Sequence, residues 1–177
     1  TVTALSGTSI TGAATNGILA NATGVGAGDV TVTNAALIGS SLDHISNYGV
    51  SSWITGGAGN TGDVVLDNTA AVFADIVGLY AYNDGAGNVT VTNSGALAGL
   101  DWGIYADSEG GGNTVVTNTG VINVGGTPRT VTAITALLNG TTTGGALGRR
   151  VFLADGQLTL LLTFSGGIQA NAKVVVP

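Results

Sequence analysis

One short string of residues occurs four times in this chain, and this repeat limits the fold more than any other feature of the sequence. The string begins with glycine and ends with asparagine, and its copies read GDVTVTN at 28–34, GDVVLDN at 62–68, GNVTVTN at 87–93 and GNTVVTN at 112–118. The four asparagines are 34, 25 and 25 residues apart. A unit of about 25 residues is typical of a solenoid, in which each repeat forms one turn and packs against its neighbours.

A second motif alternates with the first and completes the unit. It reads GILA from Gly17, GVSS from Gly49, GLYA from Gly78 and GIYA from Gly103, at spacings of 32, 29 and 25 residues. Apolar and polar residues alternate within both motifs, which is the pattern of half-buried strands. Each unit is therefore expected to supply about three short strands.

Strand parity predicts which residues face the interior. The expected inward columns are Val30, Val64, Val89 and Thr114; Val32, Leu66, Val91 and Val116; Ile38, Val72, Leu97 and Ile122; Ile18, Val50, Leu79 and Ile104; and Ala20, Ser52, Ala81 and Ala106. If each unit is one turn, like residues stack on like at the parallel-strand spacing of ~4.8 Å. The expected fold is all-β, a parallel β-helix with rungs of about 25 residues.

Four asparagines, Asn34, Asn68, Asn93 and Asn118, share the parity of the buried valines. Asparagine is a poor strand former that suits turns. We expect a structural amide ladder at one corner, because a stacked carboxamide can donate to one neighbour and accept from the other, and an unsatisfied buried group costs about 1–3 kcal/mol. Independent turn residues are the alternative. Glycine-rich segments such as GVGAG and GGAGNTG are expected at the opposite corner, where positive φ angles are needed.

These strings resemble the passenger repeats of bacterial autotransporters and related exported adhesins, in which sequences of the type G-D/N-V-T-V-T-N-S/T-G and G-I-Y-A recur. The resemblance covers about Gly12 to Gly126. It implies a right-handed β-helix and export to the cell surface.

The repeat does not continue beyond about residue 127, so we divide the chain into repeats at 1–127 and a C-terminal segment at 128–177. Alternating patterns predict strands in QLTLLLTF at 157–164 and in the last segment at 168–176, and more weakly at 130–138. The open end of a β-helix exposes unpaired backbone that invites association. The C-terminal segment is therefore expected to cap the coil or, as the alternative, to join subunits.

Acidic and basic residues separate along the chain, whose net charge is −6. Nine of the ten acids precede Pro128, and every base follows it: Arg129, Arg149, Arg150 and Lys173. The acidic part would repel phosphate backbones, so nucleic-acid binding is disfavoured. Opposite charges at the two ends suit head-to-tail contact in a homo-oligomer, and a solvated acidic surface is the alternative. No apolar run reaches the roughly 18 residues of a transmembrane helix.

The chain contains no cysteine and no methionine and starts at Thr1. Without cysteine there is no disulfide framework. The missing initiator methionine indicates a processed chain or a fragment, and export with signal cleavage would explain the processing. We therefore expect a secreted, extracellular or cell-surface location.

Candidates for catalysis are few. Hydrolases and lyases with a β-helix need clustered carboxylates, commonly with a base or a metal. The repeats contain no lysine or arginine, and the column of Asp29 and Asp63 continues as Asn88 and Asn113, which favours a role in turns. The single histidine, His44, is expected in a surface loop. The sequence therefore predicts no enzyme, no catalytic residue and no transition-metal site.

Calcium is the one cofactor that the sequence leaves open. The segment GGAGNTGDV at 56–64 partly resembles calcium-binding nonapeptide repeats. Thr61 occupies the position of the ligand aspartate, however, and the spacing differs. Calcium bound by acidic turns is therefore an alternative, and the expected state has no cofactor.

Aromatic residues gather in the later copies of the second motif. Exposed aromatic rings flanked by acids can stack on sugar rings, and a packing surface under a loop or subunit is the alternative. The candidate carbohydrate-binding residues are Tyr80, Tyr82, Trp102, Tyr105, Asp101 and Asp107. The overall expectation is a secreted, non-enzymatic structural or adhesive protein that self-associates into a filament or forms an adhesin stalk. A carbohydrate-binding adhesin module is the alternative, and a polysaccharide-active enzyme is less favoured.

Overall fold

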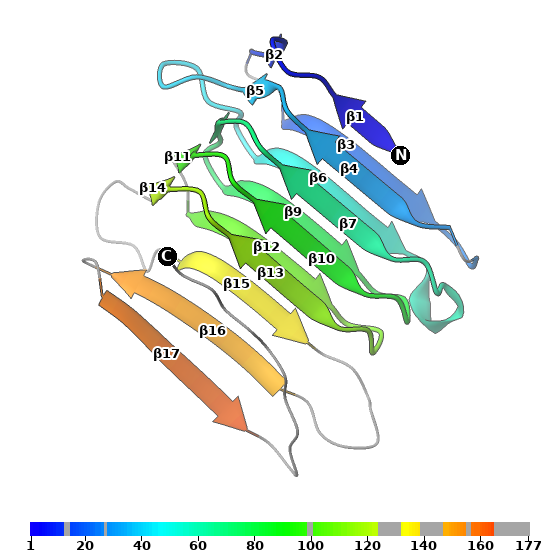
Figure 1. Ribbon diagram of the computed structural model, residues 1–177. Helices are drawn as coiled ribbons and strands as arrows, with labels where there is room; N and C mark the ends of the chain where they lie inside the picture. The colour runs from blue at the N-terminus through cyan, green and yellow to red at the C-terminus, as the bar shows by residue number, and fades with distance from the viewer. Residues whose placement is uncertain are drawn as a thin grey trace.

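The chain is a β-solenoid of about four turns in the computed structural model, which describes residues 1–12, 15–26, 28–98 and 101–123 and three strands at 132–138, 147–154 and 157–164 (Figure 1). The only helix among these residues is the short 3₁₀ turn Gly57–Gly59. No described helix is long and apolar enough to cross a membrane. The expected all-β class and the parallel solenoid are confirmed.

Each turn contributes one strand to each of three sheets. The first two turns hold β1 (Val2–Ala4), β2 (Ser9–Ile10), β3 (Asn16–Thr23), β4 (Val30–Asn34), β5 (Leu37–Ile38) and β6 (Tyr48–Thr55). The next two hold β7 (Val64–Asn68), β8 (Val72–Phe73), β9 (Val77–Asn83), β10 (Val89–Asn93), β11 (Leu97–Ala98) and β12 (Trp102–Ser108). A further rung begins with β13 (Thr114–Asn118), β14 (Ile122–Asn123) and β15 (Thr132–Leu138).

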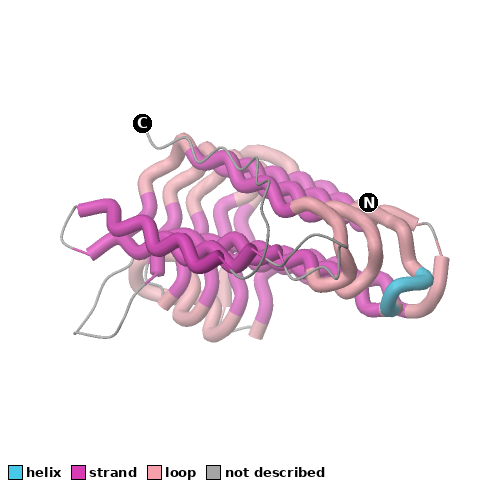
Figure 2. Tube along the Cα trace, turned by 90° about the horizontal axis from the view of Figure 1, so that it is seen from below, coloured by secondary structure: helices cyan, strands magenta, loops and turns pink. Residues whose placement is uncertain are grey.

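The repeat is the physical basis of the parallel pairing. Sheet A has the order β1-β4-β7-β10-β13, sheet B is β2-β5-β8-β11-β14, and sheet C contains β3-β6-β9-β12-β15. Equivalent residues pair across rungs, as Asn34 does with Asn68 and Tyr80 with Tyr105. Figure 2 shows successive strands lying over one another, with the loops at the corners. Two copies of the same string therefore occupy the same place in adjacent turns.

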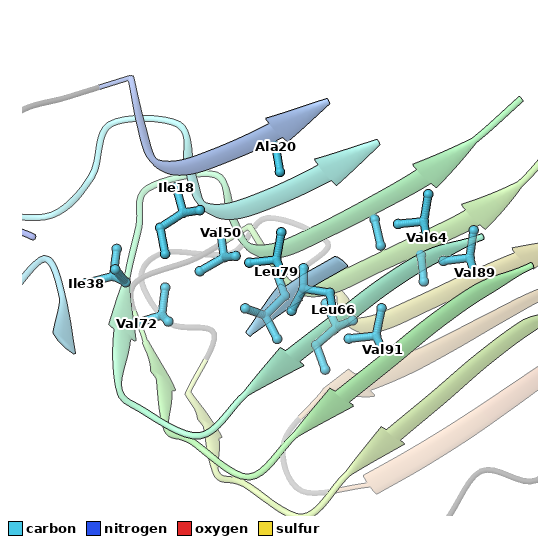
Figure 3. Close-up of a cluster of buried hydrophobic side chains, with 14 of the residues drawn as sticks. Ile18, Ala20, Ile38, Val50, Val64, Leu66, Val72, Leu79, Val89 and Val91 are labelled. Carbon is cyan, nitrogen blue, oxygen red and sulfur yellow. The ribbon is translucent and has the colours of Figure 1, made fainter. Parts of the chain in front are cut away.

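The core lies between the sheets and contains the predicted inward columns together with Ala36, Ile45, Ile54 and Ala74, which were not predicted. Their side chains converge from several strands (Figure 3). Val32, Leu66 and Val91 from sheet A are fully buried, as are Ile38 and Val72 from sheet B. Burial of a side chain of this kind stabilises the fold by about 1.5–3 kcal/mol. Only the last rung departs from the pattern, since Thr114 and Ile122 are partly exposed there.

Glycine serves two different purposes at the corners. Positive φ angles, as expected for the glycine-rich segments, occur at Gly24, Gly57 and Gly111. The glycines that open the first motif have another cause, because a Cβ on Gly87 would collide with the carbonyl oxygen of Gly62 in the preceding rung. Equivalent collisions arise at the neighbouring rungs. The expectation of positive φ thus explains only part of the glycine pattern, and close approach of successive rungs explains Gly62, Gly87 and Gly112.

The strands after residue 131 first continue the solenoid and then depart from it. β15 pairs parallel to β12, whereas β16 (Leu147–Ala154) pairs antiparallel to β15, and β17 (Gln157–Phe164) antiparallel to β16. The strand expected at 157–164 is confirmed, and the one expected at 130–138 is present as β15. The segment at 168–176 lies outside the described residues, and the division at residue 127 stays a prediction.

Candidate functional site

Five aromatic rings form a cluster on the outer side of sheet C, and Tyr80 is its centre. The Tyr80 ring stacks on Tyr48 with a centroid distance of 4.8 Å and on Tyr105 at 5.3 Å. It meets Trp53 edge-on at 5.9 Å and lies 6.4 Å from Tyr82. The cluster contains all four tyrosines of the chain and one of its two tryptophans. We call these five residues the aromatic cluster.

The parallel register of sheet C brings these rings together. Tyr80 on β9 pairs with Tyr105 on β12, and Tyr82 pairs with Trp53 on β6. Residues paired in adjacent rungs have side chains on the same face, one rung apart. Aromatic neighbours at this separation stabilise one another by about 0.5–1.5 kcal/mol beyond burial of area. Shared register positions therefore account for Tyr80 with Tyr105 and for Tyr82 with Trp53, whereas Tyr48 pairs with Val77 and reaches Tyr80 from the preceding rung.

The structure brings together only part of the predicted carbohydrate-binding set. Tyr80, Tyr82 and Tyr105 lie in the aromatic cluster, whereas no ring contact joins Trp102 to another described residue. Asp101 is partly exposed and directly precedes β12, the strand that begins with Trp102. Sequence reasoning missed Tyr48 and Trp53. The alignment of Gly49 with Gly78 places Trp53 opposite Tyr82 and so carried a signal for that residue, whereas it places Tyr48 opposite Val77 and gave no signal for it.

Two carboxylates bind tyrosine hydroxyls at the edge of the cluster. The Tyr82 hydroxyl donates to Glu109 Oε2 at 2.7 Å, and the Tyr105 hydroxyl donates to Asp107 Oδ2 at 3.1 Å. Asp107 is only 2% exposed, and its Oδ1 atom has no hydrogen-bond partner. Burial raises the pKa of Asp107, and the negative charge of Glu109 adds to the shift, although the bond from Tyr105 acts in the opposite direction. Asp107 is thus enclosed and not available to an external ligand.

Three phenols of the cluster, Tyr80, Tyr82 and Tyr105, have a pKa above that of free tyrosine. Burial is the largest cause of the rise of the Tyr80 pKa to about 12, with smaller contributions from Tyr48 and the two acids. Burial also raises the pKa of Tyr82, whose hydroxyl bond to Glu109 favours the neutral phenol. The pKa of Tyr105 is raised by burial and then by the charge of Asp107. A negative charge on any of these phenols is disfavoured.

Stacking limits how the cluster could contact a sugar. Tyr48 and Tyr105 come from the rungs on either side of Tyr80, so both faces of the Tyr80 ring are occupied by other rings. A sugar that stacks on an aromatic ring needs an open face. Contact with Tyr80 is therefore restricted to its edge and hydroxyl, whereas Trp53 meets it edge-on and is partly exposed.

The four repeat asparagines are joined in one chain of hydrogen bonds. Asn34 Nδ2 donates to Asn68 Oδ1, Asn68 to Asn93, and Asn93 to Asn118, each at 2.7 Å. Each amide also donates to a backbone carbonyl two residues ahead, as Asn93 does to Gly95 at 2.9 Å. The first three side chains are fully buried. The amide ladder therefore connects four rungs through side chains in addition to the backbone.

A second ladder is formed by the residue that follows the first glycine of the first motif, which is aspartate in two copies and asparagine in the other two. Asp29 Oδ1 accepts the backbone N–H of Asp63 at 2.9 Å, and Asp63 Oδ1 accepts that of Asn88 at 2.7 Å. Asn88 Oδ1 in turn accepts the backbone N–H of Asn113 at 2.9 Å. These oxygens serve the turn of the next rung. Among the described residues, no three histidine, cysteine, aspartate or glutamate side chains form a group that could hold a metal ion.

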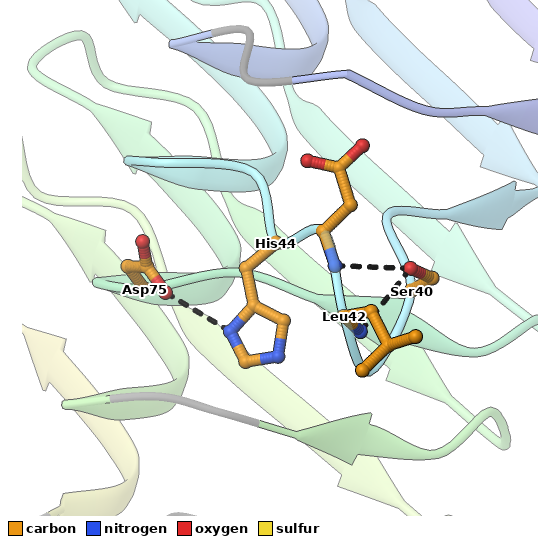
Figure 4. Close-up of polar contacts among 5 residues, drawn as sticks. Ser40, Leu42, His44 and Asp75 are labelled. Atoms are coloured by element: carbon orange, nitrogen blue, oxygen red, sulfur yellow. Dashed lines mark hydrogen bonds and ion pairs between the residues drawn. The ribbon is translucent and has the colours of Figure 1, made fainter.

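His44 lies in the long connection between β5 and β6, as expected for a loop residue. Its Nδ1 atom lies 2.9 Å from Asp75 Oδ1 in the next rung (Figure 4). The preceding Asp43 accepts the backbone N–H of Gly12 at 3.0 Å, and its own N–H donates to Ser40. The insertion is thus tied to the rungs on both sides. Exposed ion pairs of this kind stabilise by about 0–1 kcal/mol.

Comparisons with protein-family models, with curated proteins and with solved structures found no match to this chain. Its function must be inferred from the ladders, the aromatic cluster and the sheet edges.

Proposed function

We propose that this chain is a non-enzymatic structural and adhesive solenoid of an exported cell-surface protein, and that it acts by association of its sheet edges into longer stacks. The observation that carries the proposal is the continuity of the ladders. Two rows of side-chain hydrogen bonds run along the stack parallel to the backbone bonds, and each crosses four rungs. Separation of two adjacent rungs would break the bond of each ladder that joins them together with their backbone bonds, as for Asn68 to Asn93 and Asp63 to Asn88, which suits a part that carries load.

The acids support a structural role more than a catalytic one. Asp29 and Asp63 are engaged with backbone N–H groups, and Asp107 is buried beneath the cluster. General acid–base catalysis needs carboxyl groups that can reach a substrate in a cleft. The similarity of the repeats to exported passenger repeats supports the proposed location at the cell surface.

The sheet edges supply the means of association. Among the residues that the structure describes, β1, β2 and β3 each pair with one neighbouring strand, and no described strand pairs with the other side of each. Ala4 accepts a hydrogen bond from Ala35 at 2.9 Å and therefore faces β4, whereas Thr3 presents its backbone groups to the open side. Edges of this kind accept further strands. Further rungs, in the same polypeptide or in a second copy, can extend the stack there.

A proline at Thr3 tests this mechanism. Proline has no N–H to offer to an added strand, and the pairing of β1 with β4 uses the other side. We expect Thr3→Pro to raise the concentration at which the chain assembles in sedimentation velocity experiments. Thr3→Val keeps the N–H and is the matched control. Equal assembly of the two variants, or no assembly of the unmodified chain at any concentration, contradicts the proposal.

Carbohydrate binding at the aromatic cluster is the second candidate, supported by the partial exposure of all five rings. A bound glycan would contact Trp53 and the edges of the tyrosines, and ring contact of this kind would change the tryptophan emission. Titration with surface polysaccharides, monitored by fluorescence of the unmodified chain and of Trp53→Phe, is the test. Saturable binding that disappears in the variant supports this candidate. Binding that persists unchanged places the glycan elsewhere, and no binding removes the candidate.

A further inference from the structure

The four tyrosines have an arrangement that favours one-electron oxidation and coupling. They are all in one cluster, and the chain contains no cysteine or methionine to compete for an oxidant. Three of the rings, from three successive rungs, form a continuous stack through Tyr48, Tyr80 and Tyr105. All are partly exposed, so a small oxidant or an oxidising enzyme can reach them.

Proton acceptors are already in place. Loss of an electron makes a phenol strongly acidic, so oxidation of tyrosine proceeds readily where the hydroxyl already donates to a base. The Tyr82 hydroxyl donates to Glu109 and the Tyr105 hydroxyl to Asp107, at 2.7 and 3.1 Å. Tyr82 is in turn 6.4 Å from the Tyr80 ring. A radical formed at Tyr82 or at Tyr105 therefore lies next to the Tyr80 ring.

We propose that Tyr80 and Tyr105 form a dityrosine cross-link that joins β9 to β12 when the protein meets a peroxide and a haem peroxidase. Their ring centroids are 5.3 Å apart and the ring planes are only 11° from parallel, so the two rings already face one another before reaction. The residues are directly paired in the sheet, so the new bond closes a link between adjacent rungs. Such a link would reinforce covalently what the amide ladder holds by hydrogen bonds.

The chemistry balances with hydrogen peroxide as the oxidant. Each phenol loses one electron to the oxidised haem and one proton to its surroundings, which gives two phenoxyl radicals. The radicals couple through the ring carbons next to the oxygens, one carbon–carbon bond forms, and the hydrogens on those carbons move to the oxygens to restore two phenols. The two electrons and two protons reduce one hydrogen peroxide molecule to two water molecules.

The test is treatment of the purified full chain with horseradish peroxidase and hydrogen peroxide at low protein concentration. We expect dityrosine fluorescence, a monomeric chain whose mass has fallen by two hydrogens, and a cross-linked peptide pair that contains Tyr80 and Tyr105. Dityrosine found only in covalent dimers, or only between other tyrosines, overturns the proposal. So does oxidation confined to the tryptophans.

Two phenylalanine variants separate this proposal from general reactivity of exposed tyrosine. Tyr80→Phe keeps a ring in the stack but removes the phenol, and it is expected to lose the intramolecular cross-link. Tyr48→Phe is the matched control, since it changes the other stacked neighbour and leaves the reacting pair intact. Circular dichroism of both variants before oxidation shows whether each remains folded. An equal yield of intramolecular dityrosine in the two folded variants contradicts the assignment.

Discussion

At the scale of single residues, stacking makes the position in a rung more important than the residue type alone. A buried asparagine is costly by itself, yet Asn93 accepts from Asn68 and donates to Asn118 and Gly95. Its polar atoms are satisfied because the same residue recurs in the neighbouring rungs. The repeat therefore turns a residue that is unfavourable in an isolated strand into a link between turns.

Removal of a central asparagine should be more harmful than removal of a terminal one. Asn93→Ala deletes two inter-rung bonds and leaves Asn118 Oδ1 without its donor, whereas Asn118→Ala affects a partly exposed end of the ladder. An unsatisfied buried group costs about 1–3 kcal/mol. We expect the free energy of unfolding, measured by urea denaturation, to fall by that amount for Asn93→Ala and by clearly less for Asn118→Ala. Equal losses would show that the ladder does not act as a connected unit.

The glycine that opens each first motif offers a comparison within one column. A Cβ on Gly87 would collide with the carbonyl oxygen of Gly62, but a Cβ on Gly28 would have nothing within 4 Å. Overpacking of this kind costs about 1–3 kcal/mol. We expect Gly87→Ala to unfold at a clearly lower temperature than the unmodified chain. The unfolding temperature of Gly28→Ala should remain close to that of the unmodified chain. A similar loss in both variants would refute close approach as the cause.

At the scale of elements, the sequence predicted the interior well and the outer face less well. The columns of Val32, Leu66 and Val91 followed from parity, because burial rewards the same choice in every rung. The aromatic cluster was predicted only in part. Trp53 directly follows the GVSS string, and Tyr48 pairs with Val77 and not with a tyrosine, so the motif itself did not show that these two rings join the cluster. The stacking of Tyr48, Tyr80 and Tyr105 also could not be predicted, because alternation of polar and apolar residues indicates the face of a side chain but not the orientation of its ring.

Alkaline pH should weaken the outer face of sheet C. The pKa of Tyr80 rises to about 12 in the folded chain, from about 10 for an unperturbed tyrosine, so folding favours the neutral phenol. This contribution to stability is complete below pH 10 and is lost as the pH rises through 12. We expect the free energy of unfolding to fall over this window, and less steeply in Tyr80→Phe. A phenolate absorbance that is missing from Tyr80→Phe and develops in the folded unmodified chain at the pH of free tyrosine would contradict the buried environment of Tyr80.

At the scale of the whole molecule, the length of the repeat determined the architecture. A period near 25 residues with two alternating motifs leads to three sheets, which the structure contains. The antiparallel turn of β16 and β17 could not be predicted from the repeat, since it departs from it. What the stack does depends on its edges, and these are the same backbone groups that hold the interior rungs together. The proposed assembly would therefore link the fold to the proposed function.

The most direct measurement is negative-stain electron microscopy of the purified chain across a concentration series. We expect that uniform fibres one solenoid wide appear as the concentration rises, and that they persist in mild detergent because backbone hydrogen bonds hold them. Discrete particles of constant size at every concentration would contradict association through the sheet edges. Adhesion by the aromatic cluster would then be the candidate to pursue.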